Sequence, residues 1–172
     1  MKSQLMAQSP LFNWQTLREL TPWTLLYEQP IHGKILEVEL IGGPKIEVFR
    51  AEDGVFYFCH GLTFGGKAAP GGAVSPFSGN DVRTILRCSY AAVVPDAAAR
   101  EGDILVWSGL DNDAPHSAIL TGPTVEQGKS YLSYSSKILT KNGRLPEEEM
   151  TLERLIGDEF SYGDSFRLFR KN

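Results

Sequence analysis

Short runs of alternating apolar and polar residues, separated by turns, constrain the fold of this chain most strongly. Residues 34–40 read KILEVEL, residues 45–50 read KIEVFR, and Gly42-Gly43-Pro44 lies between them. Each run matches the two-residue period of a β-strand with one buried face, and a short turn between two such runs predicts an antiparallel hairpin. We therefore expect a sheet of antiparallel strands.

Further strands are predicted in the C-terminal half of the chain. They lie at 104–107 (ILVW), 116–122 (HSAILTG), 129–136 (KSYLSYSS) and 165–170 (SFRLFR), and residues 123–128 form a hairpin loop between the second and the third. Short helices are expected at 13–20 and 22–27, after a cap at Ser78 or Asn80, and from Thr151 onward. Helices and strands that are segregated along the chain in this way indicate an α+β fold.

Length and composition limit the classes of protein to which the chain can belong. A length of 172 residues is that of one domain, and 42% hydrophobic with 22% charged residues is typical of a globular protein. The formal charge of -4 and the lack of a Lys/Arg cluster argue against a nucleic-acid partner. The sequence contains no apolar run of roughly 18 residues, so we expect no membrane span.

The compartment and the state of the cysteines also follow from the sequence. The first residues lack the apolar segment of a signal peptide, so a cytoplasmic location is expected, with non-classical export as the alternative. Cys59 and Cys88 lie in dissimilar contexts and are expected to be free thiols. No Cys-x-x-Cys or His-x3-His pair is present, so we predict neither a metal nor a cofactor. The oligomeric state is not determined by the sequence.

Cys59 is the candidate nucleophile, and it needs a base because the thiolate is the reactive form. Of the three histidines, His32 lies in a turn and is expected at the surface. His60 is adjacent to Cys59, and adjacent side chains point in different directions, which makes His60 a poor base. His116 opens a predicted strand directly after a polar loop and is therefore the preferred base. A buried structural cysteine and a surface histidine are the alternative interpretation.

Two segments resemble a known group of enzymes. Tyr57-Phe58-Cys59-His60-Gly61-Leu62 is similar to the Tyr-x-Cys-x-Gly-Leu segment of NlpC-type peptidases. Pro95, Glu101 to Trp107 and then His116 to Leu120 resemble the Pro-Gly-Asp-Leu-Val-Phe strand and the His-Val-Gly-Ile strand of the same family. The likeness covers about residues 55–140, and the two segments occur in the family's order.

The resemblance implies a papain-like α+β fold, shared with CHAP-type amidases, in which the nucleophile starts a helix that packs on a central antiparallel sheet. It implies a single domain over residues 1–172, with an extension of about residues 1–50 that the family lacks. The implied activity is hydrolysis of an amide in a peptide or in peptidoglycan. A non-catalytic binding protein on the same scaffold and a thiol-dependent acyl transferase are the alternatives. In the family a small Ser or Thr follows the nucleophile, whereas this chain has His60.

A papain-like site also contains a third polar residue, which orients the histidine. If Leu120 and Thr121 pair with Ser130 and Tyr131, Ser135 lies opposite His116. The alternatives are Ser133 on the same face of the strand and, if the strand runs longer, Thr140 or Asn142.

Three further residues are expected to line the site and contact the substrate: Tyr57, His60 and Asp113. The resemblance implies that Tyr57 is an oxyanion donor or a substrate contact, and strand packing is the alternative. Asp111 and Asp113 flank His116 and would favour its protonated form if their carboxylates come close. The alternative interpretation is a solvated acidic turn.

Overall fold

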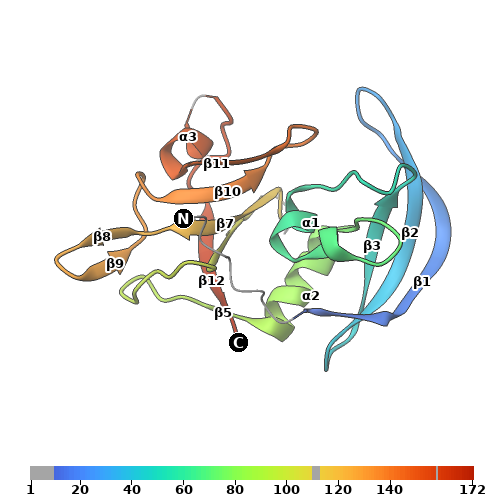
Figure 1. Ribbon diagram of the computed structural model, residues 1–172, viewed down its shortest axis with the longest axis horizontal. Helices are drawn as coiled ribbons and strands as arrows, with labels where there is room; N and C mark the ends of the chain where they lie inside the picture. The colour runs from blue at the N-terminus through green and yellow to red at the C-terminus, as the bar shows by residue number, and fades with distance from the viewer. Residues whose placement is uncertain (1–9, 110–112, 158) are drawn as a thin grey trace.

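Two antiparallel sheets enclose two helices in the computed structural model of the protein (Figure 1). The structure describes residues 10–109, 113–157 and 159–172. One sheet has the strand order β1-β2-β3-β4 and the other has the order β11-β10-β7-β6-β12-β5, with every described pair antiparallel. Between residues 10 and 172, no described helix is long and apolar enough to cross a bilayer.

The four-stranded sheet contains β1 (Phe12–Leu25), β2 (Ile31–Leu40), β3 (Lys45–Ala51) and β4 (Ser75–Pro76). The six-stranded sheet contains β5 (Tyr90–Ala92), β6 (Ile104–Trp107), β7 (His116–Gly122), β10 (Lys137–Lys141), β11 (Glu147–Thr151) and β12 (Phe166–Lys171). A separate hairpin is formed by β8 (Thr124–Glu126) and β9 (Lys129–Tyr131). The helices are α1 (Cys59–Thr63), α2 (Gly79–Ser89), α3 (Leu152–Ile156) and the 3-10 helix η1 (Gly66–Ala68).

The strands predicted from alternation are confirmed at β2, β3, β6, β7 and β12. The two helices expected at residues 13–20 and 22–27 are wrong, because this segment forms the single long edge strand β1. Its pairing with β2 contains two register shifts, and Pro22 is tolerated because an edge strand has one side without ladder bonds. Cross-strand hydrogen bonding therefore overrides the weak local helix signal here.

One apolar core joins the two sheets through α2. Val82 and Ile85 on one face of α2 pack with residues of β2 and β3 and with Ile104 and Val106 of β6. Ser78 caps the helix through a reciprocal pair of hydrogen bonds with Asp81, as one of the two expected caps. This core places α1 and α2 between the sheets, as Figure 1 shows.

A second core lies on the other face of the six-stranded sheet. Leu105 and Trp107 of β6 pack there with Leu152 and Leu155 of α3. Because β6 is buried on both faces, its four residues are all apolar, which explains the uninterrupted ILVW run. The two cores cover both faces of β6, and β6 pairs with β7, the strand that begins at His116.

Candidate active site

Cys59 is the first residue of α1, and its side chain is only 8% exposed. The helix lies against β4 on one side and against β7 and β10 on the other. Gly61 is required by this packing, since a Cβ atom there would lie 2.6 Å from Ser75 Oγ and 2.8 Å from the Val74 carbonyl oxygen. The glycine of the Tyr-x-Cys-x-Gly-Leu segment thus lets α1 approach β4 closely and positions the thiol.

His116 is the first residue of β7 and is 1% exposed. Its ring is stacked on that of Tyr162, with ring centroids 3.9 Å apart and an interplanar angle of 16°, and Trp107 packs nearby. Its Nε2 atom lies 2.8 Å from Thr140 Oγ1 on β10. Ring stacking and this hydrogen bond fix the imidazole plane. They leave Nδ1 as the nitrogen that can accept a proton from Cys59.

The thiol of Cys59 interacts with two imidazoles. Burial of the thiol opposes ionisation, but the charge of His60 and the interaction with the His116 imidazole outweigh this effect and hold the pKa of Cys59 well below its ordinary value. A thiolate held by cationic neighbours is the state in which a cysteine is nucleophilic at neutral pH. The structure therefore brings the two residues of the predicted dyad together.

The expected third residue, Ser135, is not next to His116. It is exposed and hydrogen-bonds with Ser133 and Thr124 beside the β8–β9 hairpin. The expected hairpin register is wrong, because β7 pairs with β10, with Leu120 opposite Ile138. Residues 129–136 contribute only the short β9 and a turn before β10 begins.

Thr140, one of the alternatives, occupies the position expected for the third residue. Its side chain is fully buried, and its hydroxyl contacts the His116 ring. Asn142 is also buried, but its Oδ1 atom has no hydrogen-bond partner among the described residues. The arrangement is a row of Cys59 on α1, His116 on β7 and Thr140 on β10.

In any reaction that uses Cys59 and His116 as a pair, replacing Thr140 with valine should lower kcat roughly tenfold or more, because the His116 ring loses the buried hydrogen bond that orients it. KM should change little, since the hydroxyl faces the imidazole. Thr121→Val is the matched control: the Thr121 hydroxyl is buried on β7 without a hydrogen-bond partner among the described residues. Steady-state kinetics of the two variants would test this role, and equal losses in both would contradict it.

Two of the residues expected to contact substrate, Tyr57 and His60, have their polar atoms in hydrogen bonds within the protein. The Tyr57 hydroxyl donates to the carboxylate of Glu147, which also accepts from Lys67 Nζ at 2.8 Å, so this hydroxyl is already engaged. Burial and the hydrogen bond to Glu147 raise the pKa of Tyr57. Both ring nitrogens of His60 are bonded within the protein. The geometry thus gives no support to substrate contacts by the polar atoms of Tyr57 and His60.

Asp113 accepts a hydrogen bond from the Ala114 backbone N–H, and its charge acts on His60. Burial of the His60 ring lowers its pKa, but the net shift is upward. The negative charge of Cys59, the hydrogen bond to the Ala114 carbonyl and the charge of Asp113 all favour the protonated ring. Asp111 lies outside the described residues.

Lys141 is a residue near the site that has no clear signal in the sequence. Lys141 follows Thr140 on β10 and donates to the carbonyl oxygens of Gly143 and Leu145. Burial lowers the pKa of Lys141, while the negative charges of Glu147 and Cys59 oppose the shift. Only the pairing of β10 with β7 brings this lysine near the thiol, so no local pattern could identify it.

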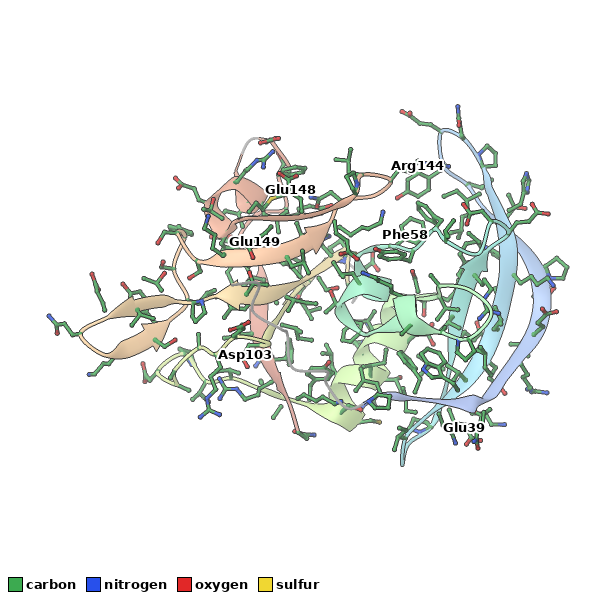
Figure 2. The ribbon with its side chains drawn as sticks, viewed as in Figure 1. Glu39, Phe58, Asp103, Arg144, Glu148 and Glu149 are labelled. Atoms are coloured by element: carbon green, nitrogen blue, oxygen red, sulfur yellow. The ribbon has the colours of Figure 1, made fainter. Side chains whose placement is uncertain are left out.

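Aromatic side chains from distant segments surround the site. Phe58 packs edge-to-face against Phe56, and the ring of Tyr27, from the turn between β1 and β2, lies 5.8 Å from that of Phe58. Figure 2 labels Phe58 and Arg144, and the Arg144 guanidinium lies 5.8 Å from the ring of Phe56 and donates to the Gln29 carbonyl oxygen. The N-terminal sheet therefore contributes directly to the surroundings of Cys59.

Comparison with known proteins found no family model, curated protein or solved structure that matches the chain. Across residues 10–109, 113–157 and 159–172, no group of three His, Cys, Asp or Glu side chains is arranged to hold a metal ion. Cys88 is an exposed free thiol near the end of α2 and is separate from this site.

Proposed function

We propose that this protein is a cysteine hydrolase of papain-like type that cleaves an amide bond through Cys59 and His116. The observation that carries the proposal is the packing of α1, which begins at the buried Cys59, against β7, which begins at His116, together with the hydrogen bond between the far nitrogen of this imidazole and Thr140. The lowered pKa of the Cys59 thiol supports the same pairing. A nucleophile, a base and a residue that orients the base are the three groups that this chemistry requires.

The proposed reaction uses these groups in sequence. His116 accepts the proton of Cys59 at Nδ1 while Nε2–H donates to Thr140, and the thiolate attacks the amide carbonyl carbon. The oxyanion is stabilised by the backbone N–H of Cys59, one of the first-turn groups of α1 that lack an intrahelical acceptor. His116 then protonates the leaving amine, and water, deprotonated by His116, hydrolyses the thioester.

The order of elements supports the papain-like comparison. The nucleophile begins a helix, the base begins the next long strand of the central sheet, and the orienting hydroxyl lies on the adjacent antiparallel strand. The strands β1 to β3 precede this unit and fall in the extension of about residues 1–50 expected from the sequence, while β4 joins their sheet from the segment after α1. The architecture is thus proposed as a papain-like domain with an N-terminal sheet.

The substrate class proposed is a peptide or a peptidoglycan fragment, and this part rests on the resemblance of the two sequence segments. Purified protein should be incubated with a panel of peptides and cell-wall peptide fragments and analysed by mass spectrometry. We expect release of a free amine and a transient acyl adduct on Cys59, with the same result in a Cys88→Ser variant. An adduct that passes to an added amine in preference to water would assign acyl transfer. The absence of product and adduct across the panel would contradict hydrolysis.

A further inference from the structure

His60 has both ring nitrogens in short hydrogen bonds, and their partners define its charge. Nε2 lies 2.6 Å from the carbonyl oxygen of Ala114, and Nδ1 lies 2.7 Å from Ser117 Oγ. A carbonyl oxygen only accepts hydrogen bonds, so Nε2 must carry a proton. The charge of His60 therefore depends on the direction of the hydrogen bond between Nδ1 and Ser117.

Thr63 determines that direction. The Ser117 hydroxyl donates to Thr63 Oγ1 at 2.8 Å, and the Ser117 side chain is completely buried. A hydroxyl has a single proton, so Ser117 Oγ can only accept from His60 once that proton is committed to Thr63. Nδ1 then also carries a proton, and a ring protonated at both nitrogens is an imidazolium cation.

This cation is adjacent to the thiol of Cys59. The charged groups that act on Cys59 are His60 on α1, His116 on β7 and Lys141 on β10, and Tyr162 in the segment before β12 also interacts with it. Besides Cys59, the charged group that acts on His60 is Asp113. A nearby positive charge favours the ionised form of a thiol.

We propose that His60 is a fixed imidazolium that stabilises the Cys59 thiolate electrostatically, while His116 is the histidine that transfers protons. This assignment rests on the proposed function in that it concerns the same thiol. His60 donates to Ser117 and to Ala114 throughout the reaction and keeps both protons, so its charge is present when the thiolate attacks and when it is expelled. His116 exchanges its proton with Cys59, with the leaving amine and with water.

The test is a titration of the Cys59 thiolate by ultraviolet absorbance in a Cys88→Ser background, which needs neither a substrate nor turnover. His60→Gln should raise the apparent pKa of Cys59 by about 1 or more, which is a tenfold or larger loss of thiolate at lower pH. His32→Gln is the matched control, because His32 bonds to Thr24 on the β1–β2 hairpin and should leave the titration unchanged. An unchanged titration in His60→Gln would overturn the proposal.

A second variant keeps the test decisive if His60→Gln does not fold. Thr63→Val preserves side-chain shape and removes the acceptor of Ser117, so the serine can donate to His60 Nδ1 and the ring can become neutral. Nitrogen NMR of the imidazoles should show two protonated nitrogens on His60 at neutral pH in the unchanged protein and one in Thr63→Val. A single protonated nitrogen on His60 in the unchanged protein would refute the assignment. Hydrolysis is measured separately, so its absence would count against the proposed function alone.

Discussion

Replacing Cys59 with alanine should abolish amide hydrolysis, lowering kcat/KM by about 10⁴-fold or more, as expected when the nucleophile of a covalent mechanism is removed. Cys59 is the first residue of α1, which packs against β7, the strand that His116 begins, and the other described cysteine, Cys88, is exposed on α2. Cys88→Ala is therefore the matched control and should retain full activity. Assays of both variants on the same amide substrate measure the effect.

In the proposed mechanism the nucleophile Cys59 and the base His116 act as a unit, which allows a sharper test. His116→Gln alone should cause a loss of similar order, and the double variant Cys59→Ala/His116→Gln should lose little more than either single variant. Far-ultraviolet circular dichroism of each variant separates loss of chemistry from loss of fold. Activity above about a hundredth of the original in Cys59→Ala would be inconsistent with covalent catalysis.

The largest effect on stability is expected for Arg170→Met, which should lower the free energy of unfolding by about 3 kcal/mol. Asp103 is 2% exposed, and its carboxylate accepts from Arg170 Nε at 2.8 Å and from Arg170 Nη2 at 2.7 Å. The Arg100 backbone N–H also donates to it. Without the guanidinium, the buried Asp103 carboxylate has no charge partner. The resulting loss in the free energy of unfolding is larger than the net contribution of the ion pair.

Arg167→Met is the matched control for this substitution, because Arg167 lies on the same strand, β12, with its guanidinium near the ring of Phe169. It should change the free energy of unfolding by less than about 1 kcal/mol. Denaturant unfolding of the two variants would measure the difference. Equal values would mean that Asp103 is adequately stabilised by backbone groups alone. Asp103, labelled in Figure 2, directly precedes β6, so this pair ties the last strand to the strand beside His116.

Local sequence signals predict the strands that have a regular pattern of buried residues and the helices that begin at a capping residue. The alternating segments at residues 34–40 and 45–50 form β2 and β3, and the apolar run at 104–107 forms β6 between two cores. The cap at Ser78 and the helix from Thr151 also follow from short-range hydrogen bonding. Each of these depends on periodicity or on contacts within a few residues, which is the information that a single sequence carries.

Long-range pairing explains the predictions that were wrong. Residues 13–25 contain a helix-compatible pattern, but β2 offers a free edge, and its ladder makes β1 a strand. The expectation that Ser135 lies opposite His116 requires β7 to pair with the residues that follow it directly in sequence. In the structure, β8 and β9 form their own small hairpin and β7 pairs with β10. The choice of partner strand depends on burial of whole faces, and no local pattern specifies it.

The sequence predicts that His60 is a poor partner for Cys59, since adjacent side chains in a regular element diverge. In the structure, the imidazole is held by Ser117 and Ala114 and also interacts with the thiol, because α1 lies against the beginning of β7. Contacts between these elements redirect a side chain whose direction was inferred from α1 alone.

The sequence by itself determined the antiparallel strands and singled out Cys59 and His116 as the candidate pair, through short motifs and their order. Only the tertiary structure decided that Thr140 meets the imidazole and that His60 has both nitrogens bonded near the thiol. It also decided that the N-terminal segment is a strand. The physical reason is that hydrogen bonds and charges act through space over a few Å, between residues that are distant in the chain, such as His60 and Ser117, which are 57 positions apart.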